Sequence, residues 1–107
     1  MCRLPFGELL DAAHIQTDAD GGAARVSNGL ALCRIHHGAF DTNILGIDAD
    51  YHVSIKESVL ETFDGPTLQH ALKDMHGAKL AQLPTHRHER PDRSLLDERF
   101  QKFMRAS

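Results

Sequence analysis

Two short apolar stretches enclose a loop rich in Asp and Gly, and a stretch with helical character follows them directly. Residues 12–15 and 30–32 are apolar enough for short strands, and residues 17–25 contain the aspartates and glycines of a loop. Residues 34–42 suit a short helix. The sequence therefore predicts two antiparallel strands with a helix directly after the second.

The same stretch carries His14, Asn28 and His37, in that order along the chain. One imidazole with an ordinary pKa of about 6.5 can take a proton from water at physiological pH. His37 and Asp41 are four residues apart, so on a helix they share one face and can hold one ion. An amide can orient the remaining parts. The set is chemically complete for hydrolysis of a phosphodiester.

The strings LLDAAHI, NGLALC and HHGAFD, separated by the Asp/Gly-rich loop, resemble the HNH nuclease family. The closer resemblance is to HNH domains at the C-termini of restriction-type endonucleases. It is tightest over residues 9–47 and extends more loosely to the last helix. It implies an α+β fold with a ββα-metal core over about 9–43, and a hairpin and helical extension over about 44–107. We expect one domain over 1–107.

The resemblance assigns His14 as the general base and Asn28 as the residue that braces the loop between the strands. It assigns His37 and Asp41 as ligands of the catalytic metal. The family often has His where this chain has Asp41. Since a carboxylate makes the ligand set harder, we expect Mg²⁺ or Mn²⁺ there.

Many members of the family have an acid directly before the base histidine, where this chain has Ala13. Residues 11 and 13 of a strand share one face, so Asp11 can replace the missing acid as a metal ligand. The alternative is that Asp11 only makes a turn or a supporting hydrogen bond.

Cys33 and His36 have the spacing of half a zinc knuckle. Neighbouring helical residues point about 100° apart, so we expect His36 and His37 to serve different ions. Cys2 would be a third ligand of this structural zinc, and its usual partner would fall before Met1. We therefore expect the zinc site to be incomplete; alternatively, Cys33 is a small buried apolar residue.

The chain has 107 residues, of which 41% are apolar and 25% charged, as in soluble globular domains. No apolar run approaches ~18 residues and no signal peptide is visible, so we expect a cytoplasmic protein without membrane contact. The net charge of −3 argues mildly against a general nucleic-acid binder.

Double-stranded DNA is the partner that the resemblance implies. We expect its phosphates to meet four arginines, namely Arg25, Arg34, Arg87 and Arg90. The arm over 83–93 can also be a solvated linker, because Glu89 and Asp92 interleave with its arginines. A homodimer is an open option. Relatives are usually longer, with an N-terminal region thought to recognise DNA.

Beyond the core, residues 44–47 and 51–55 alternate like the strands of a hairpin. Residues 57–63 and 67–76 read as helices, the second ended by Gly77. A last helix starts after Asp92 or Ser94 as its N-cap.

These patterns predict metal-dependent endonucleolytic cleavage of DNA, within a restriction or defence system. The alternative is a zinc-stabilised DNA-binding or structural module that has lost nuclease activity through N-terminal truncation.

Overall fold

A two-stranded antiparallel ribbon positions the residues of interest. The computed structural model describes residues 6–16, 26–81 and 83–106. Strand β1 (Leu10–His14) pairs with strand β2 (Gly29–Cys33), so that Leu10 lies opposite Cys33 and His14 opposite Gly29. A 3-10 turn, η1 (Gly7–Leu9), precedes β1, and another, η3 (Val26–Asn28), precedes β2.

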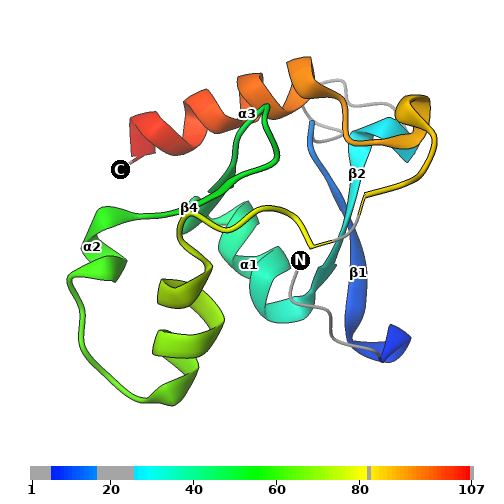
Figure 1. Cartoon of the computed structure of the whole chain (residues 1–107). Coiled ribbons are helices and arrows are strands. Elements are labelled where there is room, and N and C mark those ends of the chain that lie inside the picture. The colour runs from blue at the N-terminus through cyan, green and yellow to red at the C-terminus, as the bar shows by residue number, and fades with distance from the viewer. Residues whose placement is uncertain (1–5, 17–25, 82, 107) are drawn as a thin grey trace.

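Helix α1 (Arg34–Asp41) follows β2 without a connecting loop, as the sequence predicts. Its buried residues are His36, Ala39 and Phe40. In Figure 1 the helix lies between the ribbon and a second hairpin, which it also contacts. Asn43 ends the helical turn with a φ of 61°, a left-handed conformation that Asn tolerates well.

The second hairpin consists of β3 (Leu45–Ile47) and β4 (Val53–Ile55), which confirms the hairpin expected from the alternation. Its turn is organised by Asp48, whose Oδ1 accepts hydrogen bonds from the backbone N–H groups of Asp50 at 2.9 Å and His52 at 3.0 Å. Tyr51 completes the turn with a φ of 65°.

The C-terminal helix α3 (Arg93–Ala106) packs across β3 (Figure 1). Asp92 is its N-cap, because Oδ1 accepts hydrogen bonds from the N–H groups of Ser94 at 2.8 Å and Leu95 at 3.2 Å. Gly46 lies directly under the ring of Phe103, and a Cβ at that position would come within 2.6 Å of it. The helix can approach the strand only because residue 46 has no side chain.

Residues 57–76 depart from the predicted pair of regular helices. Helix α2 is short (Glu57–Leu60), and the second segment is a π-helical turn, η4 (Leu68–Leu72), followed by a 3-10 turn, η5 (Lys73–Met75). One cause is tertiary: the Ala71 carbonyl accepts a hydrogen bond from His36 at 2.7 Å. Gly77 ends the segment with a φ of 84°, as expected of a helix stop.

The predicted arm over 83–93 contains one 3-10 turn, η6 (Arg87–Glu89). The core joins the ribbon, α1, the second hairpin and α3 in one cluster of buried side chains: Ala13, Ile15, Leu30, Leu32, Ala39, Phe40, Leu45, Ile47, Val53, Ile55 and Leu96. The fold is α+β. None of the helices in the described part of the chain has the length and apolar character needed to span a bilayer.

Candidate functional site

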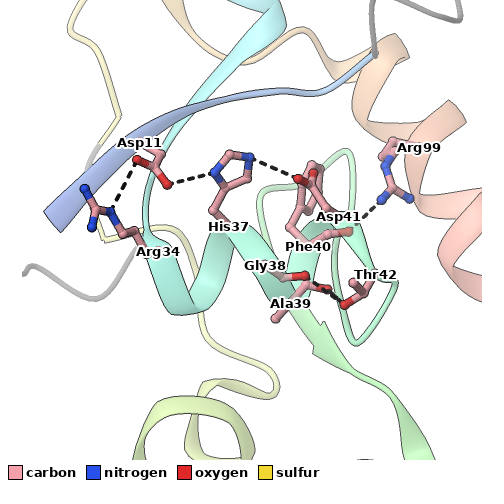
Figure 2. A network of polar contacts seen from close by, with 9 residues as sticks. All are labelled: Asp11, Arg34, His37, Gly38, Ala39, Phe40, Asp41, Thr42 and Arg99. Carbon is pink, nitrogen blue, oxygen red and sulfur yellow. Dashed lines mark hydrogen bonds and ion pairs between the residues drawn. The ribbon is translucent and has the colours of Figure 1, made fainter.

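The imidazole of His37 lies between two carboxylates (Figure 2). Its Nδ1 is 3.0 Å from Oδ2 of Asp11, and its Nε2 is 3.1 Å from Oδ2 of Asp41. The structure thus brings together all three residues that the sequence nominates as metal ligands. Asp11 comes from β1, whereas His37 and Asp41 come from successive turns of α1.

Strand alternation explains why Asp11 reaches the helix. Asp11 and Ala13 share one face of β1, and Ala13 on that face is buried while Leu10 and Ala12 on the other face are exposed. Asp11 is partly buried at the open end of the ribbon, where α1 begins. His37 and Asp41 meet because residues four apart lie one above the other on a helix.

The two contacts of His37 cannot both be hydrogen bonds of a neutral imidazole. A neutral ring carries one N–H, and ionised carboxylates only accept. Only one ring nitrogen of a neutral His37 can therefore donate to a carboxylate, and the other nitrogen presents a lone pair that can bind a cation.

The side of the ring that faces Asp41 fits a divalent ion. Adjacent ligands of an octahedral Mg²⁺ at about 2.1 Å lie about 3.0 Å apart, and the His37 Nε2 to Asp41 Oδ2 separation is 3.1 Å. Within the described residues, no three His, Cys, Asp or Glu side chains converge on a common point. An ion here would therefore complete its coordination with water or substrate oxygens, as Mg²⁺ usually does.

Asp11 lies on the opposite nitrogen of the same ring, so its carboxylate and that of Asp41 do not face one point in this geometry. A hydrogen bond from Nδ1–H to Asp11 would leave the Nε2 lone pair free to bind. Arg34 flanks this carboxylate, with its Nε 4.0 Å from Asp11 Oδ1. Arg34 is 70% exposed, so this contact is a weak, solvent-screened one.

His14 ends β1 and is exposed on the face opposite to that of Asp11 and Ala13. No polar side chain among the described residues lies within hydrogen-bond distance of its imidazole. It stands at the end of the ribbon where β2 starts, opposite Gly29. Its ring is thus open to solvent, and the structure does not bring it into contact with His37 or Asp41.

Asn28 is fully buried at the same end of the ribbon. Its Oδ1 accepts a hydrogen bond from the Gln16 N–H at 2.8 Å, and its Nδ2 donates to the Gln16 carbonyl at 3.0 Å. The Asn28 carbonyl also accepts from the Ile15 N–H at 3.0 Å. Asn28 therefore ties together the two ends of the segment that connects β1 to β2.

Cys33 and His36 form a second buried pair, separate from His37. His36 Nε2 lies 2.7 Å from the Ala71 carbonyl, which fixes the proton on Nε2, and Nδ1 lies 3.3 Å from Cys33 Sγ. Adjacent ligands of a tetrahedral zinc, with bonds of about 2.3 Å to sulfur and 2.0–2.1 Å to nitrogen, lie about 3.5 Å apart. The pair fits half of a zinc site. Cys2 lies outside the described residues.

The four predicted DNA contacts are distributed over the molecule. Arg34 begins α1 beside Asp11, while Arg87 and Arg90 belong to the arm around η6. Arg90 donates from Nε to the Pro84 carbonyl at 2.8 Å. Arg25 lies outside the described residues.

Arg99 of α3 is a residue that the sequence reasoning did not assign to the site. Its Nη1 donates to Asn43 Oδ1 at 2.5 Å, and its Nη2 donates to the Phe40 carbonyl at 2.6 Å. Figure 2 shows its guanidinium directed at the carbonyl of Phe40, near the end of α1. The sequence does contain one signal for this contact: Arg99 falls among the regularly spaced apolar residues of the last helix, on the side that faces the core. A cation there can reach the free carbonyls at the C-terminus of another helix.

Comparison with known sequences adds one positive finding. The sequence model of a family described as HNH endonuclease matches residues 1–48. This segment includes both strands of the ribbon and all of α1. No curated protein matches the chain, and neither does any solved structure.

Proposed function

We propose that this chain works as a member of the HNH endonuclease family, whose model matches residues 1–48, and that it hydrolyses phosphodiester bonds of double-stranded DNA with a divalent metal ion. The observation that carries the proposal is the placement of His37 between Asp11 and Asp41. We assign the ribbon and α1 to the ββα-metal core, and the chain to the restriction or defence endonucleases.

In this proposal, His37 Nε2 and Asp41 hold Mg²⁺ or Mn²⁺. When bound, such an ion stabilises charge on the phosphoryl oxygens and on the leaving 3′-oxygen. Asp11 keeps the proton of His37 on Nδ1 and fixes the orientation of the ring. This differs from direct ligation by Asp11, which would require its carboxylate to leave Nδ1.

His14 takes the proton of the attacking water in this scheme. Its exposure at the end of β1 leaves the ring accessible to a phosphate and its attacking water. Asn28 supports this end of the ribbon through Gln16 and does not itself contact the reacting atoms. The positions of the base and the ligands are thus set by different elements: the end of β1 and the exposed face of α1.

The experiment that tests the function is cleavage of supercoiled plasmid DNA by the purified protein with Mg²⁺ or Mn²⁺, and with EDTA in place of the metal. We expect nicked and linear products only with a divalent ion. Absence of any product with Mg²⁺, Mn²⁺ or added Zn²⁺ would overturn the proposal.

The Cys33–His36 pair supports a second candidate, a zinc-stabilised binding module without nuclease activity. Its zinc would be held by Cys33, His36 and Cys2. Zinc analysis of the wild-type protein and of Cys33→Ser tests the metal, and plasmid cleavage separates the two functions. A protein that retains zinc and binds DNA without cutting it would favour the second candidate.

A further inference from the structure

A cleft of about 510 Å³ lies where the arm around η6 meets the start of α3. Three separate parts of the chain contribute to its walls, which include Ser27, Tyr51, Arg87, Arg90, Arg93 and Ser94. Its volume is in the range of about 300–1,000 Å³ that small ligands occupy in proteins.

The residues that line the cleft carry a net positive charge, opposite in sign to the net charge of the whole chain. Three arginines line it against one carboxylate, that of Asp92, whereas the whole protein has a net charge of −3. Asp92 is already engaged as the N-cap of α3. The local excess of positive charge from the arginines is typical of a surface that binds anions.

Several donors of the cleft are available to a ligand. The guanidinium of Arg93 already forms an ion pair, since its Nη2 lies 2.8 Å from Asp50 Oδ1. In contrast, the exposed Arg87 guanidinium has no carboxylate partner among the described residues, and Arg90 uses only Nε within the described chain. The hydroxyls of Ser27 and Ser94 add neutral donors.

The cleft adjoins the end of the ribbon that carries His14. Ser27 lines the cleft and is held against it, because its carbonyl accepts a hydrogen bond from the Asp92 N–H at 2.8 Å. Two residues later, Gly29 pairs with His14 across the ribbon. Figure 1 shows the arm around residue 87 beside the start of β2.

We propose that this cleft binds a backbone phosphate of duplex DNA on the flank of the cleaved bond, with Arg87 and Arg90 as its main donors. The inference rests on the proposed function, which it deepens by fixing where the DNA backbone runs. Phosphate contacts of this kind set the register of a protein on DNA and carry no base specificity.

The test is fluorescence anisotropy of a labelled duplex in EDTA, which separates binding from cleavage. We expect Arg87→Gln to weaken binding about tenfold, as the loss of a charge-assisted contact does. The slope of log affinity against log salt should fall by about 0.9 for the lost phosphate contact. Two duplexes of unrelated sequence should be affected equally.

Arg105→Gln is the matched control, because Arg105 is an exposed arginine on the last turn of α3 and does not line the cleft. It should bind like the wild type, and melting curves check that both variants are folded. Plasmid cleavage with Mn²⁺ is measured on the same proteins.

If the wild type binds and cleaves DNA while Arg87→Gln and the double variant Arg87→Gln/Arg90→Gln keep its affinity and salt slope, the cleft is not the phosphate site and the nuclease proposal stands. If the wild type neither binds nor cleaves DNA, both proposals fail.

Discussion

Asn28 closes the segment between the two strands of the ribbon by bonding both backbone polar groups of Gln16 through its side-chain amide. The amide is completely buried, so each of these bonds replaces one to water that is no longer possible. Because His14 lies two residues before Gln16 in the chain, the clamp fixes the backbone at the proposed base.

We expect Asn28→Ala to destabilise the protein by about 1–3 kcal/mol, because it leaves the partly buried backbone groups of Gln16 without these partners. Urea denaturation of the two proteins measures this difference. Asn28→Asp keeps the acceptor for the Gln16 N–H, and when it is protonated its O–H can donate to the Gln16 carbonyl. At low pH it should therefore retain more stability than Asn28→Ala. An Asn28→Ala protein as stable as the wild type would show that these hydrogen bonds do not contribute to the stability of the fold.

The sequence predicts the ribbon, α1 and the second hairpin well, since each depends on local spacing and on short apolar stretches. It could not predict the segment over 67–76 in the same way. Leu68, Leu72 and Met75 have the spacing of a regular helix, but the Ala71 carbonyl turns to His36, which is far away in the sequence. Tertiary contacts decided the geometry of that segment.

In the candidate site, too, some contacts follow from local sequence spacing and others depend on tertiary structure. The pairing of His37 with Asp41 follows from helical spacing alone. The contact of His37 Nδ1 with Asp11 depends on the strand register and on the angle between ribbon and helix, which no local pattern contains. The role of Arg99 and the cleft around Arg87 likewise depend on contacts between distant segments.

His37→Ala and Asp41→Ala should each weaken Mn²⁺ binding strongly, because we propose both as ligands. Asp11→Asn should weaken it less, by about 10–100-fold, which is the usual effect of losing the partner of a metal-binding histidine. Calorimetric titration with Mn²⁺ ranks the three variants. Equal losses in all three would instead indicate that Asp11 is a ligand, and unchanged affinity in all three would place the ion elsewhere.

Gly46→Ala should destabilise the fold by about 1–3 kcal/mol, as overpacking of a filled core does. The new methyl group would come within 2.6 Å of the Phe103 ring, so α3 would have to shift away from β3. Gly38→Ala is the matched control: it is on α1 with no atom within 4 Å of the added Cβ, and it should stabilise the helix by about 0.5–1 kcal/mol. The melting temperatures of the two variants measure this difference. An equal decrease in both melting temperatures would contradict this packing argument.

Arg99→Met should lower stability by about 1–3 kcal/mol, because the Phe40 carbonyl loses a charged donor while the apolar stem is preserved. Arg99→Lys keeps the charge but lacks the fork that reaches both Asn43 and the Phe40 carbonyl, so it should restore only part of the loss. Chemical denaturation of the three proteins measures the order. Full recovery by lysine would mean that charge alone matters at the end of α1.

The most direct test of the nuclease assignment is the rate of plasmid cleavage by His14→Ala, measured beside the wild type at equal Mn²⁺ occupancy. His14 is exposed at the end of β1 and has no part in the proposed metal contacts, so the variant should fold and bind Mn²⁺ as the wild type does. Its cleavage rate should fall by about 10²–10⁴-fold, the usual loss on removing a general base. A folded, metal-loaded His14→Ala protein that cuts at the wild-type rate would contradict the account.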